Sequence, residues 1–435
     1  MRVNLVELVV RAENLSGEKV RGLTAADFVV TEGGKRQKID HIEEVDIHHP
    51  DGVHASDRSR LMILLDFKNT EYASMVGAFE FLRNFVEEFD FETSDLGLSF
   101  NLTGVQTVQP FTRNRAEFLA AVAKTEQFYN TKGHRSARTK NFTRRQLVAD
   151  SDYFRQEIEV LGQFVNFLGA YNGRKNLLLV SNPWAFGRND VQEGRRNIRG
   201  VVSLRDIQTT AQFNKVTLNI LNLEPSPNDS EGRFARTSAD VGIDESAELA
   251  AKTSGVYYRV NRGGLGTTME RVADDLSHFY RIRYYSNVKH QRYRRVNVKV
   301  KGLNRVGNHF AGFFPESELA PKKEVHGMLK GDTDAQVLAV QTDWMSWRRS
   351  GRKERGVNVV VSYRAFDELG QMIAERVQAT ELRVKKEKGK YAYPVLAQEV
   401  FFNWAEDQKP ARFEARIVDM TSGERVLIQH QLAAN

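Results

Sequence analysis

The chain has 435 residues, 41% of them hydrophobic, with 63 Lys and Arg against 56 Asp and Glu and a formal net charge of +7. This composition excludes a disordered chain, and the length predicts two or three domains. The absence of cysteine excludes disulfides, thiolate zinc sites, iron–sulfur clusters and a cysteine nucleophile, and no apolar run is long enough for a membrane-spanning helix.

The N-terminal residues 1–45 are rich in β-forming side chains and predict short strands joined by turns. Gly33-Gly34 is typical of a hairpin turn, and Thr24 followed by Asp27 predicts a capped single turn. The opening MRVNLVELVV lacks the apolar segment of a signal peptide, so for an exported protein we assume that a leader has been removed. The polar residues 46–60 predict a linker.

Residues 55–280 alternate between strand and helix patterns. The run LMILLD, ending at Asp66, is typical of a strand buried on both faces of a parallel sheet. The further predicted elements are a helix carrying Val76, Phe79, Leu82, Val86 and Phe89, strand 96–102, helices 114–125 and 143–170, strand 176–181, helix 200–213, strand 216–223, helix 245–255 stopped by Gly255, strand VYYRV and helix 266–280. This alternation predicts a βαβ-wound, mostly parallel sheet. Such sheets bind ligands at the carboxyl ends of their strands, which here are Asp66, Ser181 and the stretch after Leu223.

The rest of the chain predicts β structure. We expect residues 280–315 to pair with residues 1–45 in one sandwich, into which an α/β domain at 55–280 is inserted. Strand patterns at regular spacing after residue 322 predict a separate C-terminal β-sandwich over 322–435. They are VLAVQTDW, VNVVVSYRAF, YPVLAQEVFF, RFEARIVDM and RVLIQHQL.

Three stretches, in this order, resemble the bacterial, acidobacterial-type von Willebrand factor A-related proteins. They are VRGLTAADFVVTEGGKRQKI (20–39), LMILLDFKNT (61–70) and GRKNLLLVSNPWAF (173–186). The resemblance implies a fold of the α/β class, a von Willebrand A-like doubly wound, mostly parallel sheet flanked by β-sandwich domains. It also implies a metal ion-dependent adhesion site, in which an Asp-x-Ser-x-Ser loop, a Thr and a further Asp hold a divalent cation.

This chain departs from that metal-binding pattern. Asp66 and Thr70 match the first and last loop positions, but Lys68 stands at the middle Ser position and Asn182 where the further Asp is expected; Thr131 is a candidate for the Thr. One carboxylate beside an ammonium group is a poor Mg²⁺ site. We therefore expect a degenerate site and no cofactor, with Asp66, Thr70 and Thr131 as weak metal candidates. Two interpretations of Lys68 stay open: its ammonium replaces the ion near Asp66, or it points into solvent.

Other clusters carry weaker signals. Four histidines between residues 41 and 54 follow no metal-ligand spacing, and the glycines of NRGGLGTTME follow no phosphate-loop pattern. Basic clusters occur at 132–145, 195–199 and 281–305, the last interleaved with tyrosines, which is a pattern that can bind nucleic acid. Alternating strands place Arg and Tyr on opposite faces in any case. No motif for a catalytic nucleophile and its base occurs, and Asp274-Asp275 is interpreted as a solvated pair on a helix.

The sequence thus predicts a non-enzymatic protein-interaction or adhesion module, exported in a bacterium to the periplasm or the cell exterior. Partner binding is expected at Asp66, Lys68, Asn69, Thr70, Asn182 and Trp184. Two alternatives remain: a structural subunit of a larger envelope or extracellular assembly, and a binder of nucleic acid or another anionic polymer. The modest net charge argues against nucleic acid.

Overall fold

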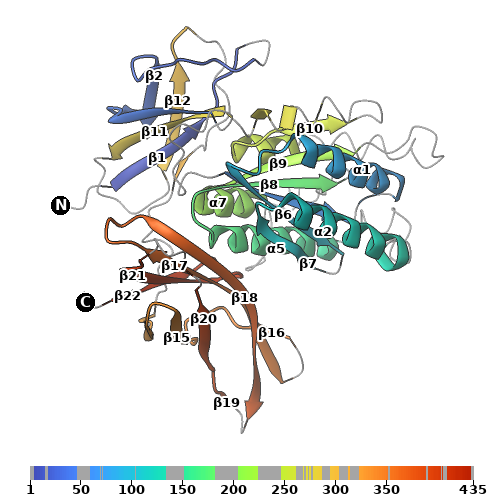
Figure 1. Cartoon of the computed structure of the whole chain (residues 1–435), viewed down its shortest axis with the longest axis vertical. Helices are drawn as coiled ribbons and strands as arrows, with labels where there is room; N and C mark the ends of the chain where they lie inside the picture. Colours follow the sequence, from blue (N-terminus) through green and yellow to red (C-terminus); the bar gives the residue numbers. More distant parts are fainter. Residues whose placement is uncertain are drawn as a thin grey trace. The chain divides into compact units, whose positions relative to one another are not determined.

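The structure of the chain is a computed structural model (Figure 1). It describes residues 4–14, 18–46, 59–68, 70, 72–102, 104–133, 151–181, 204–223, 246–260, 268, 271–272, 274–275, 278–286, 294–302, 312–313, 323–350, 353–387, 390–402, 404 and 409–432. The chain divides into two compact units: Met1–Val53, Arg58–Val160 and Arg174–Phe314 form the first, and His54–Asp57, Leu161–Gly173 and Pro315–Asn435 form the second.

The first unit contains an α/β domain. Its elements are β5 (Ser59–Asp66), α1 (Tyr72–Glu88), β6 (Ser94–Asn101), β7 (Val105–Thr112), α2 (Arg115–Phe128), the π-helix η2 (Tyr129–Gly133), β8 (Arg174–Ser181), α7 (Leu204–Asn214), β9 (Val216–Leu223) and β10 (Tyr257–Val260). The residues of helix α5 (Ser151–Gly169) are divided between this unit and the second.

The strands of this domain form a six-stranded sheet in the order β10-β9-β8-β5-β6-β7. All neighbours are parallel except β7, which pairs antiparallel with β6. Helices α1 and α2 share one hydrophobic core with alternate residues of β5, such as Leu61 and Ile63, and α7 contacts β9. Figure 1 shows the helices flanking the sheet. The expected fold class, α/β with a mostly parallel sheet flanked by β-sandwiches, is confirmed.

The remainder of the first unit is a β-sandwich. Its strands are β1 (Asn4–Val10), β2 (Phe28–Glu32), β3 (Lys35–Arg36), β4 (His41–Asp46), β11 (His278–Ser286), β12 (Arg294–Val300) and β13 (Gly312–Phe313). They form the sheets β1-β11-β4 and β13-β12-β2-β3. The two sheets bury one shared core, which comprises Val6, Leu8, Val10, Ala12, Phe28, Val30, Tyr280, Ile282, Tyr284, Val296, Val298 and Val300. Strands from both sides of the α/β segment therefore pair with one another.

The second unit contains a β-sandwich. Its strands are β14 (Gly327–Gly331), β15 (Ala335–Gln341), β16 (Arg348–Arg349), β17 (Glu354–Phe366), β18 (Met372–Glu387), β19 (Lys390–Tyr391), β20 (Val395–Phe401), β21 (Arg412–Asp419) and β22 (Arg425–Gln431). They form the sheets β14-β15-β20 and β19-β18-β17-β21-β22, and β16 pairs with β17. Residues of both sheets, among them Leu338 and Val361, share one core.

Two local predictions are confirmed. Gly33 and Gly34 have φ of +54° and +81°, as a tight hairpin turn requires. The backbone N and the Oγ1 of Thr24 donate to the carboxylate of Asp27 at 2.8 and 2.7 Å. These bonds lower the pKa of Asp27, because they stabilise its charged form.

Two predicted helix ends are wrong. The helix expected at 266–280 does not reach residue 280, because β11 begins at His278 and places Phe279 in a strand. The helix expected to stop at Gly255 ends at residue 252, and the left-handed residue after it is Ser254, with φ of +64°. Gly255 instead lies directly against the backbone of β9.

Candidate functional site

The carboxyl edge of the parallel sheet carries a row of polar residues. Asp66 at the end of β5 is in register with Asn101 of β6, and Ser181 of β8 is in register with Asn222 of β9. Residues in register on parallel strands project from the same face of the sheet. All four residues are buried. The row therefore places one carboxylate among three neutral polar groups.

Asp66 is the centre of this row. Its side chain is 0% exposed, and its Oδ2 accepts a hydrogen bond of 2.9 Å from the Oγ of Ser181. Its backbone oxygen accepts from the backbone N of Thr70 at 3.1 Å, which closes the turn after β5. A hydrogen bond to a buried carboxylate offsets part of the cost of removing its charge from water. Asp66 thus holds β8 and the turn after β5 together.

Aromatic side chains pack against this turn. Phe67 is fully buried, and its ring lies 4.9 Å from that of Phe100 and 4.5 Å from that of Tyr129, measured between centroids. Tyr72 stacks on Tyr129 at 5.9 Å. The packing follows from burial of large apolar rings, which prefer offset or tilted contacts. These contacts bring η2, which contains Thr131, next to the turn after β5.

The donor set described at this edge does not fit a divalent cation. Asp66 supplies one carboxylate, and no group of three or more His, Asp or Glu side chains that could hold a metal occurs among the described residues. The Oγ1 of Thr131 donates to the backbone oxygen of Gln127 at 2.8 Å. Lys68, two residues after Asp66, is half-buried and brings a positive charge to the same turn. Mg²⁺ needs several hard oxygen ligands and is repelled by an ammonium group.

Three buried groups at this edge lack hydrogen bonds within the described part of the chain. They are the hydroxyls of Thr70 and Tyr257 and the side-chain amide of Asn222. Tyr257 of β10 lies near Asn222. Burial raises the pKa of Tyr257 to about 12, and the nearby amide of Asn222 opposes this rise. The two side chains form no hydrogen bond of normal geometry. Buried polar groups without partners cost free energy, and such groups also occur away from this edge, as at Ser94 and Ser254.

The structure places some of the expected partner-binding residues and not others. Asp66, Lys68 and Thr70 lie together in the turn after β5. Asn69, Asn182 and Trp184 lie outside the described residues. Sequence reasoning missed Asn101 and Asn222. The signal for them is a polar residue ending a buried apolar run, as in LGLSFN and LNILN.

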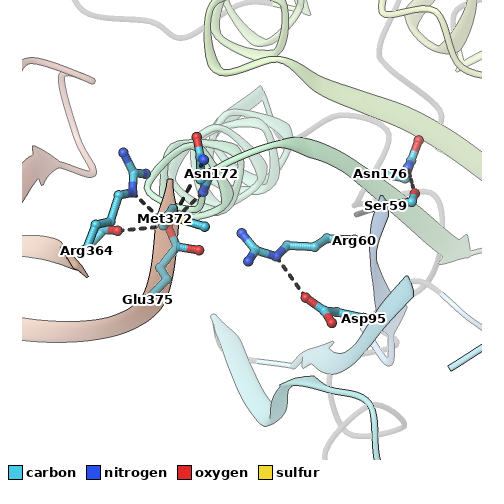
Figure 2. A network of polar contacts seen from close by, with 9 residues as sticks. Ser59, Arg60, Asp95, Asn172, Asn176, Arg364, Met372 and Glu375 are labelled. Carbon is cyan, nitrogen blue, oxygen red and sulfur yellow. Dashed lines mark hydrogen bonds and ion pairs between the residues drawn. The ribbon is translucent and has the colours of Figure 1, made fainter. Parts of the chain in front are cut away.

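The motif Gly-Arg-Lys-Asn has a structural role at the opposite, amino end of the sheet. Asn176 is buried and donates from Nδ2 to the Oγ of Ser59 at 3.1 Å. On the neighbouring residue of β5, the Nε of Arg60 lies 3.1 Å from the Oδ2 of Asp95. Figure 2 shows both contacts. The first bond joins β5 to β8 through Asn176 of the motif, and the second joins β5 to β6.

The described part of the basic cluster at 281–305 contributes to the first unit's sandwich. Tyr280 and Tyr284 are buried in the sandwich core, while Arg281 pairs with Glu43 at 2.9 Å. The interpretation of Asp274-Asp275 as a solvated pair is wrong for its second member. Asp275 is buried and accepts a 2.6 Å hydrogen bond from the Tyr258 hydroxyl.

Several other candidates fall outside the described residues: His48, His49 and His54, residues 134–145 of the first basic cluster, the cluster at 195–199, and Gly263, Gly264 and Gly266. His41, the remaining histidine of its cluster, is exposed in β4. Among the helices of the described residues, none combines the length and the hydropathy of a membrane span.

No protein-family model and no curated protein matches this chain. Similar solved structures include an aerotolerance-related membrane protein from Bacteroides fragilis, with a TM-score of 0.32 and 11% identity over 50% of this chain and 98% of that one. Proximal thread matrix protein 1 from the mussel byssus, with a zinc-occupied MIDAS motif, has a TM-score of 0.30 and 10% identity over 57% and 50%. The manganese-loaded TRAP protein of Plasmodium vivax has a TM-score of 0.30 and 8% identity over 78% and 96%. TM-scores at this level carry no inference about function.

Proposed function

We propose that the chain is a non-enzymatic protein-interaction or adhesion module that binds a protein partner at the carboxyl edge of its parallel sheet. The main support for this proposal is the buried hydrogen bond between Ser181 and Asp66. This bond between two side chains fixes the end of β5 against β8. The binding surface comprises Lys68, together with Asn69, Asn182 and Trp184, and the buried Asp66 and Thr70 position the turn that carries it. In keeping with the family resemblance, the module acts in the periplasm or outside a bacterial cell.

In this proposal Asp66 and Lys68 together replace the metal ion of an intact adhesion site, one by positioning the turn and the other by supplying positive charge. Asp66 is fully buried and positions the turn. Lys68 supplies a positive charge on that turn, in place of the ion. An ammonium group attracts carboxylates as a point charge, so the partner offers an acidic side chain. Binding is then independent of divalent metal.

Adding Mg²⁺, Mn²⁺ or Ca²⁺ at millimolar concentration to protein kept in chelator is expected to leave its unfolding temperature unchanged. A cation present at 100 times its dissociation constant would stabilise the folded state by about 2.7 kcal/mol. That would raise the melting temperature of a domain of this size by roughly 5 °C or more. The measurement is differential scanning calorimetry, which follows each transition separately. A rise that disappears in Asp66→Ala would contradict metal independence.

Lys68→Glu is expected to abolish capture of the partner from native extracts, because it reverses the charge that faces the acidic side chain. Lys124→Glu is the matched control, since Lys124 is exposed on α2. Capture is measured by affinity purification and quantitative mass spectrometry in chelator. Equal recovery of all partners by the wild type and both variants would rule out recognition through Lys68.

A further inference from the structure

The sheet β14-β15-β20 of the second unit has one face in the sandwich core and one outer face. Leu329, Leu338 and Val400 point inward and belong to the core. Alternate residues point outward, because successive side chains of a strand lie on opposite faces. The outward positions are Met328 and Lys330 on β14, Ala335, Val337, Ala339 and Gln341 on β15, and Val395, Ala397, Glu399 and Phe401 on β20.

This outer face is mainly apolar. The exposed fractions are 49% for Met328, 46% for Val337, 55% for Val395 and 63% for Phe401, and three alanines share the face with them. Single exposed apolar residues are ordinary, whereas a contiguous apolar patch on three adjacent strands marks an interaction surface. This face can therefore pack against another apolar surface.

Two charged residues lie in a defined position on this face. Lys330 is in register with Val337, and Val337 is in register with Glu399. The three side chains form one row across the sheet, with the positive charge on β14, the apolar residue at the centre and the negative charge on β20. The next row is Met328, Ala339 and Ala397.

We propose that this face pairs with the same face of a second copy of the chain, about a two-fold axis that runs parallel to β15 and passes over Val337. Such an axis exchanges the two edges of the sheet and places β14 of each copy opposite β20 of the other. Lys330 then faces Glu399 of the second copy, twice by symmetry. Val337 packs on its own counterpart, and Met328 packs on Ala397. The charge pattern is thus its own complement, as a two-fold contact requires.

The charges also exclude the other simple arrangement. A two-fold axis running across the strands over the same row would place Lys330 on Lys330 and Glu399 on Glu399, which is repulsive. Packed sheets lie about 10 Å apart, a distance that a Lys and a Glu side chain can span together. Lys330, Val337 and Glu399 are remote in sequence from Asp66, so this contact is independent of the proposed function.

The test compares the full-length wild type with single and double charge-reversal variants. Analytical ultracentrifugation between low and high micromolar concentration measures how tightly each one dimerises. The wild type is expected to dimerise. Lys330→Glu and Glu399→Lys are each expected to weaken the dimer by at least about tenfold, because each creates two like-charge contacts. The double variant is expected to recover the wild-type affinity, because the reversed pairs are again complementary. Val337→Arg is expected to give a monomer.

Circular dichroism melts check that each variant is folded, which is expected because all three positions are exposed. A wild type that stays monomeric over the whole concentration range would overturn the proposal. So would a dimer that either single charge reversal leaves unweakened. A dimer weakened by both single variants and equally weak in the double variant would overturn the two-fold pairing of Lys330 with Glu399.

Discussion

Gly255→Ala is expected to destabilise the α/β domain by about 3 kcal/mol, because a side chain at this position has no space. A Cβ at position 255 would overlap the backbone oxygen of Leu218 and would lie 2.5 Å from its carbonyl carbon. These are atoms of β9, a fully buried strand, so neither can yield without disturbing the sheet. The measurement is hydrogen–deuterium exchange of peptides covering β9 and β10, with global unfolding in urea.

Ser254→Gly is the matched control for this prediction. Ser254 has a left-handed backbone with φ of +64°, which glycine adopts without strain. This variant is expected to be neutral or stabilising by less than about 1 kcal/mol. If β9 is as well protected from exchange in Gly255→Ala as in the wild type, the close approach of residue 255 to Leu218 is not required for folding.

Glu375→Ala is expected to destabilise the second unit by about 3–5 kcal/mol, because it leaves a buried guanidinium without its carboxylate. The Nε of Arg364 lies 2.8 Å from the Oε1 of Glu375, and both side chains are buried. Oε1 also accepts from the backbone N of Asn172 at 2.9 Å, and Arg364 donates to the backbone oxygen of Ala170 at 2.7 Å. Figure 2 shows the ion pair and Asn172.

Tryptophan fluorescence in urea reports mainly on this unit, because three of the four tryptophans, Trp344, Trp347 and Trp404, belong to it. Glu381→Ala is the control. Glu381 pairs with Arg383 at 2.8 Å on the same strand, but both side chains are exposed, and no measurable change of the midpoint is expected.

A double substitution separates the cost of an unpaired charge from the loss of packing. Arg364→Met combined with Glu375→Leu is expected to recover most of the stability lost in Glu375→Ala, because an apolar pair leaves no buried charge without a partner. Equal midpoints for Glu375→Ala and Glu381→Ala would contradict a structural role of the buried ion pair.

Much of the fold could be predicted from local patterns. The apolar run ending at Asp66 forms β5, and the run ending at Ser181 forms β8. The Gly33-Gly34 turn is where it was expected, because few residues other than glycine tolerate two consecutive positive φ angles. These features depend on a few neighbouring residues, so a sequence reveals them directly.

Two strands could not be predicted because their sequences resemble other structures. The sequence of β18, MIAERVQATELRVKKE, contains many helix-forming residues, yet it pairs along almost its whole length with β17. Strand β7 contains Pro110 and many polar residues, and it is an edge strand of the sheet, where proline is tolerated. In both cases pairing with a neighbouring strand overrides local propensity.

Only part of the candidate site could be predicted, because the pairing of distant strands decides which residues meet there. Asp66 is conspicuous because an acid ends an apolar run, and its position at a strand end follows from the fold class. Asn101 and Asn222 are far from it in the sequence, and they join its row only through the order and register of the strands. The bond to Ser181 also depends on that register.

The sequence by itself determined the alternation of strands and helices, the position of Asp66 and Lys68, and the absence of cysteine chemistry, because each depends on residue type and short-range spacing. Only the tertiary structure decided that Asp66 is bonded to Ser181 and that Gly255 must lack a side chain against Leu218. It also decided that Lys330 and Glu399 flank Val337 on one face. These features depend on which distant segments pair and in what register, and the chain settles that by burying its apolar surface as a whole.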